Sequence, residues 1–169
     1  MNSHNNSQPS ITRFTTFVVA AAVLVAASLT FTLNWQIGLA TLAFGLLLSG
    51  ISALPSKNFM LHSRFMRAGI FLDISLVLFL QLTRNAVKTA VVEPLTFFQM
   101  IHIGSSLTTV LLYVGVLIFG YRLLKHQKNP LELEQYLVTR KRHLLLGKLC
   151  IALRTIGYMS MYSFYEYQS

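Results

Sequence analysis

Five long apolar segments account for most of this 169-residue chain, at residues 14–33, 36–54, 66–83, 96–124 and 144–165. A helix needs about 20 apolar residues to cross the hydrocarbon core of a bilayer, and each segment is close to that length. Only 11% of the residues are charged, whereas soluble domains carry about 25%. We therefore expect an all-α integral membrane helical bundle with five transmembrane helices and no separate soluble domain.

The first apolar segment has a second interpretation, as a cleaved signal peptide. A polar tail precedes it, and Ala26, Ala27 and Ser28 resemble a cleavage site. Its apolar run exceeds the roughly 7–15 residues of a usual signal-peptide core, so we favour a retained helix. Cleavage would leave four helices. The expected organisation is a polar tail at 1–13, one transmembrane domain at 14–165 and a C-terminal tail at 166–169.

The basic residues predict the orientation, because eleven of the 14 Lys and Arg flank one side of the membrane. Arg84 and Lys88 flank the other side, and Arg154 lies within the last segment. The positive-inside rule then places the N-terminus in the cytoplasm and the C-terminus outside a bacterial inner membrane. Basic residues at 139–142 are expected to contact acidic lipid headgroups, and no readout element for nucleic acid is evident. The eleven residues are Arg13, Lys57, Arg64, Arg67, Arg122, Lys125, Lys128, Arg140, Lys141, Arg142 and Lys148.

Two of the predicted helices each carry a histidine followed by a charge eleven residues later. The two pairs are His62 with Asp73, and His143 with Arg154. Eleven residues are about three helical turns, so each histidine shares a helix face with its charge. Ionisable groups inside a membrane normally face the protein interior and find partners. We therefore predict a buried Asp73–Arg154 ion pair beneath a pair formed by His62 and His143.

A third histidine, His102, lies on a helix that is predicted to enter from the outside. At 1.5 Å per residue it lies about 9 Å below the outer surface, near the depth expected for Asp73 and Arg154. Small and hydroxyl residues accompany all three histidines at helical spacing, and such residues let membrane helices approach closely. These residues are Gly69, Ser105, Ser106, Thr109, Gly147, Cys150 and Gly157.

Three interpretations of the histidines remain open. His62 and His143 at equal depth could ligate a haem b iron from both sides, with Arg64, Arg67 or Arg142 meeting the propionates. Alternatively, Met60, His62 and Met66 offer the thioether and imidazole ligands that suit Cu(I). In the third interpretation no cofactor binds, and the histidines contact headgroups or other helices. No catalytic motif or carboxylate pair is present, since Asp73 is the only acid at membrane depth.

Four short motifs surround the three histidines and the C-terminal end of the last segment. They are His62-Ser63-Arg64-Phe65-Met66, Ile101-His102-Ile103, Lys141-Arg142-His143 and Thr155-Ile156-Gly157-Tyr158. In order and spacing these motifs resemble the YozB-like domain-of-unknown-function family (number 420), over roughly residues 36–165, with one residue inserted in the last motif. The chain departs from the family pattern at 147–152, where the family is rich in Trp, and at Arg154.

The resemblance implies a bundle similar to cytochrome-b-like proteins and haem A synthase, with His62, His102 and His143 as the family histidines. It also implies a role in haem or copper handling during assembly of respiratory haem–copper oxidase, with the oxidase subunits as partners and no turnover chemistry. Two alternatives are a small haem-bearing electron carrier, and a cofactor-free transporter or structural subunit that uses the Asp73–Arg154 core.

Overall fold

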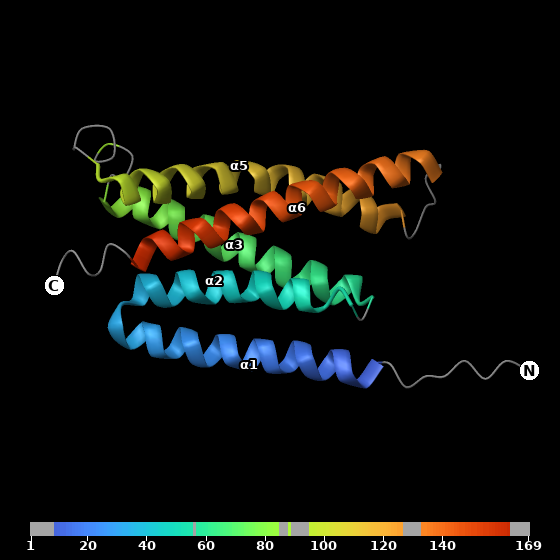
Figure 1. The fold of residues 1–169 in the computed structure, drawn as a ribbon, viewed down its shortest axis with the longest axis horizontal. Helices are drawn as coiled ribbons and strands as arrows, with labels where there is room; N and C mark the ends of the chain where they lie inside the picture. Colours follow the sequence, from blue (N-terminus) through green and yellow to red (C-terminus); the bar gives the residue numbers. More distant parts are fainter. Residues whose placement is uncertain (1–8, 56, 85–87, 89–94, 127–132, 163–169) are drawn as a thin grey trace, which may run out of the picture. The chain divides into compact units, whose positions relative to one another are not determined.

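The computed structural model of the protein describes residues 9–55, 57–84, 88, 95–126 and 133–162, with the side chains of 9–14, 16, 33, 84 and 162 excepted. The ordered elements in these ranges are helices, and no strand occurs among them (Figure 1). This confirms the predicted all-α class. The helices are α1 (Pro9–Leu33), α2 (Trp35–Ser52), α3 (Phe59–Arg84), α5 (Phe97–His126) and α6 (Leu133–Tyr162).

Four of the five helices, α2, α3, α5 and α6, are long and apolar enough to cross a membrane, whereas the described apolar part of α1, Phe17–Thr32, is shorter. Large apolar side chains on these helices are exposed, including Phe71 at 74% and Leu82 at 83%. Soluble monomers rarely expose contiguous apolar surface on this scale. The chain is therefore an integral membrane protein.

Three helices begin well before the apolar segments predict. The first segment was expected from Phe14 after a polar tail at 1–13, but α1 starts at Pro9. The third segment was expected from Met66, but α3 starts at Phe59. The last was expected from Leu144, but α6 starts at Leu133. Residues 133–137, which precede the predicted last segment, form the first turns of α6. Arg, Lys and Gln are good helix formers, so the helical backbone continues where the hydropathy falls.

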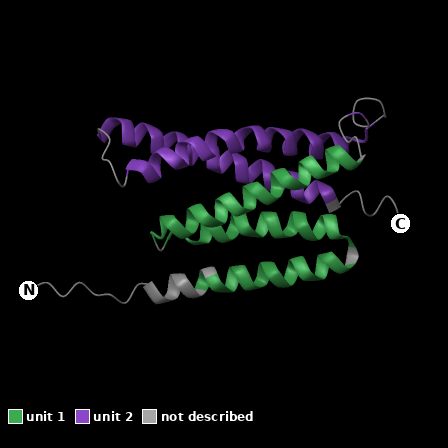
Figure 2. Cartoon of the chain, turned by 180° about the vertical axis from the view of Figure 1, so that it is seen from behind, with its two compact units in different colours: residues 1–84 green, residues 85–169 purple. Residues whose placement is uncertain are grey.

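The helices form two compact units, residues 1–84 with α1, α2 and α3, and residues 85–169 with α5 and α6 (Figure 2). Within unit 1, α2 packs against both α1 and α3; within unit 2, α5 packs against α6. The single transmembrane domain expected at 14–165 stays a prediction.

Glycines on α2 bring the helices of unit 1 close together. A Cβ atom at Gly45 would collide with the side chain of Val23, and one at Gly38 with the ring of Phe31. The turn between α1 and α2 is capped by Asn34, whose Oδ1 accepts a hydrogen bond of 2.8 Å from the Gln36 amide. Because the turn is so short, α1 and α2 form a tight hairpin.

Polar and small side chains fill the interior of unit 2. Tyr113 and Thr109 of α5 are 2% and 0% exposed. The Oγ1 atom of Thr109 donates to the Ser105 backbone oxygen on its own helix at 2.7 Å, so this buried hydroxyl is satisfied locally. Opposite it, the thiol of the buried Cys150 lies 3.9 Å from the Thr109 backbone oxygen. Cys150 thus serves as a small packing residue between the two helices.

Candidate functional site

His62 in unit 1 is held against the backbone of the preceding helix. Its Nδ1 atom lies 2.8 Å from the backbone oxygen of Gly50 on α2. A carbonyl oxygen can only accept a hydrogen bond, so Nδ1 carries the proton and donates it. In the neutral imidazole the lone pair is therefore on Nε2. The contact thus selects the tautomer in which Nε2 is the basic nitrogen.

Gly50 of α2 contacts both His62 and Met66. Met66 follows His62 by about one helical turn on α3. A Cβ atom at Gly50 would lie 2.9 Å from Met66 Sδ, so the thioether packs directly on this glycine. Met60 lies elsewhere, since it is two residues before His62 and about 160° around the helix. It is 56% exposed. The structure thus brings together His62 and Met66 of the predicted copper ligands, but not Met60.

His102 in unit 2 shows the same arrangement as His62. Its Nδ1 atom lies 2.8 Å from the backbone oxygen of Gly157 on α6, so Nδ1 again donates and the lone pair of the neutral ring is on Nε2. The hydroxyl of Ser160 donates to the same oxygen at 2.9 Å and lies 3.4 Å from Nδ1. A Cβ atom at Gly157 would lie 2.9 Å from Ser105 Oγ, so a larger residue there would push the two helices apart.

His143 packs on a glycine at the other end of the α5–α6 hairpin. Its Cε1 atom would lie 3.2 Å from a Cβ at Gly120 of α5. Gly120 is 18 residues beyond His102 on the same helix, a distance of about 27 Å at 1.5 Å per residue. His102 and His143 therefore occupy opposite ends of unit 2, and the two cannot bind the same ion.

The last helix of each unit, α3 in unit 1 and α6 in unit 2, shows the same pattern of buried residues after its histidine. Buried residues occur seven, eleven and fourteen positions after the histidine on both helices. At the eleventh position Asp73 is 4% exposed and Arg154 is 5% exposed. The predicted Asp73–Arg154 and His62–His143 pairs each draw one member from each unit, and both stay predictions. The matching positions are Gly69 and Cys150, Asp73 and Arg154, and Leu76 and Gly157.

Sequence reasoning identified the histidines but missed two of their partners. Gly50 was not singled out, and neither was Ser160. A glycine near the end of one helix, followed by a histidine in the first turns of the next, was the available signal for Gly50. Ser160 follows Gly157 by three residues, a spacing that places both on one helix face. The partners could thus have been found by pairing small residues across each expected hairpin.

The donor set fits a site with few protein ligands rather than a closed metal cage. Among the described residues, no three His, Cys, Asp or Glu side chains gather in a way that could hold a metal ion. Axial haem ligation needs only one or two imidazoles, and Cu(I) accepts imidazole with thioether. Metal-binding histidines commonly donate their second ring N–H to a carbonyl, which is what His62 and His102 do.

No family model, curated protein or solved structure matches this chain. The chemistry of the two histidine sites therefore carries the functional argument.

Proposed function

We propose that this membrane protein handles haem or copper during the assembly of respiratory haem–copper oxidase. The observation that carries the proposal is the hydrogen bond from Nδ1 of His62 to the Gly50 backbone oxygen, which leaves Nε2 as the basic nitrogen. His102 repeats the arrangement with Gly157. The role in oxidase assembly follows from the resemblance of the chain to the YozB-like family.

A fixed tautomer matters because only a neutral imidazole with a bare nitrogen binds a metal. The backbone oxygen fixes the orientation of the ring and the nitrogen that is left to bind a metal. A loading or transfer factor needs such a preset donor, but it does not need the complete ligand shell of a resident cofactor. His62 and His102 fit this requirement, because each is a single oriented imidazole donor. His62 lies between α2 and α3 of unit 1, and His102 lies between α5 and α6 of unit 2.

Haem and copper would use different neighbours of His62. For haem, the predicted second axial ligand is His143, and the guanidinium groups of Arg64 and Arg142, both exposed, would bind the propionates. For copper, Met66 would supply a thioether beside the imidazole, because both side chains meet at Gly50. When bound, haem would supply one-electron chemistry, whereas copper would be cargo.

The test is an absorption spectrum of the detergent-purified protein with and without dithionite, beside elemental analysis for iron and copper. We expect a sharp reduced α-band that disappears in His62→Ala, or stoichiometric copper that disappears in both His62→Ala and Met66→Leu. His126→Ala is the matched control, since it removes a histidine that belongs to neither site. A colourless and metal-free protein, even after reconstitution with haem and with Cu(I), would overturn the proposal.

An electron carrier would also give a haem spectrum, so a second measurement separates it from an assembly factor. A carrier titrates reversibly with a quinol or another donor. Loss of an assembly factor instead lowers oxidase activity while the oxidase subunits remain in the membrane. When the gene for this protein is deleted from its host, we expect oxidase activity to fall while the oxidase subunits remain in the membrane.

The burial of Asp73 and Arg154 favours a second candidate function, a cofactor-free transporter or structural subunit. Each side chain is at most 5% exposed, and ionisable residues at membrane depth often mark ion or substrate pathways. A proton flux into reconstituted vesicles that is lost in Asp73→Asn, in a protein without metal, would support this function in place of cofactor handling.

A further inference from the structure

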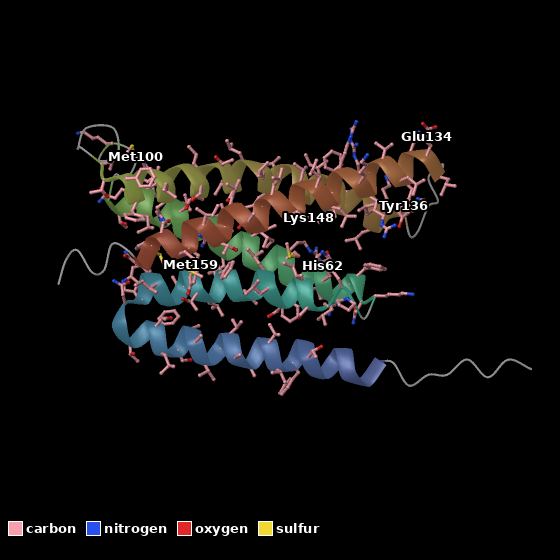
Figure 3. All side chains as sticks on the ribbon, in the orientation of Figure 1. His62, Met100, Glu134, Tyr136, Lys148 and Met159 are labelled. Atoms are coloured by element: carbon pink, nitrogen blue, oxygen red, sulfur yellow. The ribbon has the colours of Figure 1, made fainter. Side chains whose placement is uncertain are left out.

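Basic side chains of α5 and α6 lie at the same height at one end of unit 2. Two contacts fix the relative register of these helices there. His143 packs on Gly120, and the ring of His126 stacks on Tyr136 with 4.5 Å between ring centroids. Figure 3 shows Tyr136 and Glu134 near this end of α6. The residues between the two contacts on each helix are therefore neighbours across the hairpin.

Five cations fall at or near this stretch, and all five side chains are exposed. We call them the cationic collar. Glu134 is the only acidic side chain that the structure describes in unit 2, so the described part of the unit offers the five cations little negative charge. The guanidinium of Arg122 lies over the ring of Phe119, 6.0 Å from its centroid. The members of the collar are Arg122, Lys125, Arg140, Lys141 and Arg142.

The collar borders directly on an exposed apolar surface. Leu144 and Leu145 follow it on α6 and are 46% and 59% exposed; Leu117 and Ile118 precede it on α5 and are 37% and 48% exposed. From Arg142 to Tyr162 α6 rises about 30 Å, which equals the hydrocarbon thickness of a bilayer. The collar therefore lies where the headgroups begin and the acyl chains end.

We propose that the cationic collar is a binding site for the phosphate of an anionic phospholipid. The cations of two helices surround the headgroup, and the apolar residues below them contact the acyl chains. Nucleic acid or an acidic protein would match the charge but would leave the adjoining leucines uncovered. The site adjoins His143 and shares Arg142 with the proposed haem propionate contacts, but lipid binding does not require the proposed cofactor function.

The test is a titration of the full-length protein in nonionic detergent with phosphatidylglycerol or phosphatidylcholine, with bound lipid counted by native mass spectrometry. We expect tight retention of phosphatidylglycerol only. Each basic residue near an anionic surface changes the affinity about five-fold, so Arg140→Gln/Lys141→Gln/Arg142→Gln should weaken binding about 100-fold. Arg122→Gln/Lys125→Gln should weaken it about 30-fold, because two of the five cations are on α5.

The matched control removes the same charge from unit 1, in the triple variant Lys57→Gln/Arg64→Gln/Arg67→Gln. Glutamine is nearly as good a helix former as arginine and lysine, and circular dichroism checks each fold. The conservative variant Arg140→Lys/Arg142→Lys should bind as the parent protein does. Equal losses in the two triple variants would overturn the proposal, since binding would then follow net charge alone. So would equal affinity for phosphatidylcholine, or displacement of the lipid by glycerol 3-phosphate at the same concentration.

Discussion

The imidazole of His102 and the backbone oxygen of Gly157 are 2.8 Å apart and join α5 to α6. The same oxygen accepts the hydroxyl of Ser160, so one carbonyl serves two side chains. A carbonyl oxygen has two lone pairs, so it can accept hydrogen bonds from side chains of both α5 and α6. The contact thus fixes both the ring orientation of His102 and the register of the hairpin.

Removal of the His102 donor should destabilise unit 2. We expect His102→Leu to lower the free energy of unfolding by about 1 kcal/mol, the size of an interhelical hydrogen bond in a membrane protein. His102→Asn should recover most of this loss, because its amide can still donate to Gly157. Thr108→Val is the control, since the exposed Thr108 hydroxyl bonds only to Gly104 of its own helix. Unfolding in mixed detergent micelles measures all three.

A methyl group at Gly45 should force α1 and α2 apart. We expect Gly45→Ala to cost about 1–3 kcal/mol, as overpacked interiors do, because the new Cβ would collide with Val23. The second substitution Val23→Ala should relieve the clash. Gly104→Ala is the matched control, since a Cβ there would meet nothing within 4 Å. If Gly45→Ala has the same melting temperature as Gly104→Ala, then α1 and α2 do not approach as closely at Gly45 as described.

Asp73 and Arg154 should behave as coupled residues if the ion pair predicted from the sequence forms. Neutralising one member of a buried pair leaves an uncompensated charge and costs about 3–5 kcal/mol. Asp73→Asn and Arg154→Gln should each show this loss, and the double variant should lose much less than the two losses added together. A double-mutant cycle measures the coupling. Additive losses would show that each residue is buried for a separate reason.

Trp35 is the chain's only tryptophan, and its fluorescence should report the membrane interface. The indole is 43% exposed at the start of α2 and meets Phe79 of α3 edge to face, with ring centroids 5.1 Å apart. Indoles prefer the headgroup level. We therefore expect stronger quenching by lipids brominated near the headgroup than by lipids brominated near the acyl terminus. Trp35→Phe supplies the background signal.

The number and order of the helices could be predicted from the sequence because each apolar run is close to the length of a membrane crossing. The turn between α1 and α2 was also predictable, since Asn34 is a good N-cap and Trp35 an interfacial residue. The start of α3 was missed because hydropathy detects contact with lipid rather than helical backbone. Asn58 was the better signal, because its side chain caps the Leu61 amide at 3.0 Å.

The partners of the histidines could not be predicted, because they depend on the axial register between neighbouring helices. His62 meets the backbone oxygen of Gly50, near the end of α2. A shift by one turn would have given His62 a different carbonyl and left its place on the helix unchanged. Such a shift depends on loop geometry and packing volume, neither of which a hydropathy pattern records.

Helix α6 runs without a break from exposed residues at its start, such as Leu133, to buried residues of unit 2, such as Gly157. From Leu133 to Gly157 the helix rises about 36 Å as one element, and no proline interrupts it. Because α6 is one continuous helix, a displacement of its first turns would be transmitted along it to the Gly157 carbonyl that holds His102.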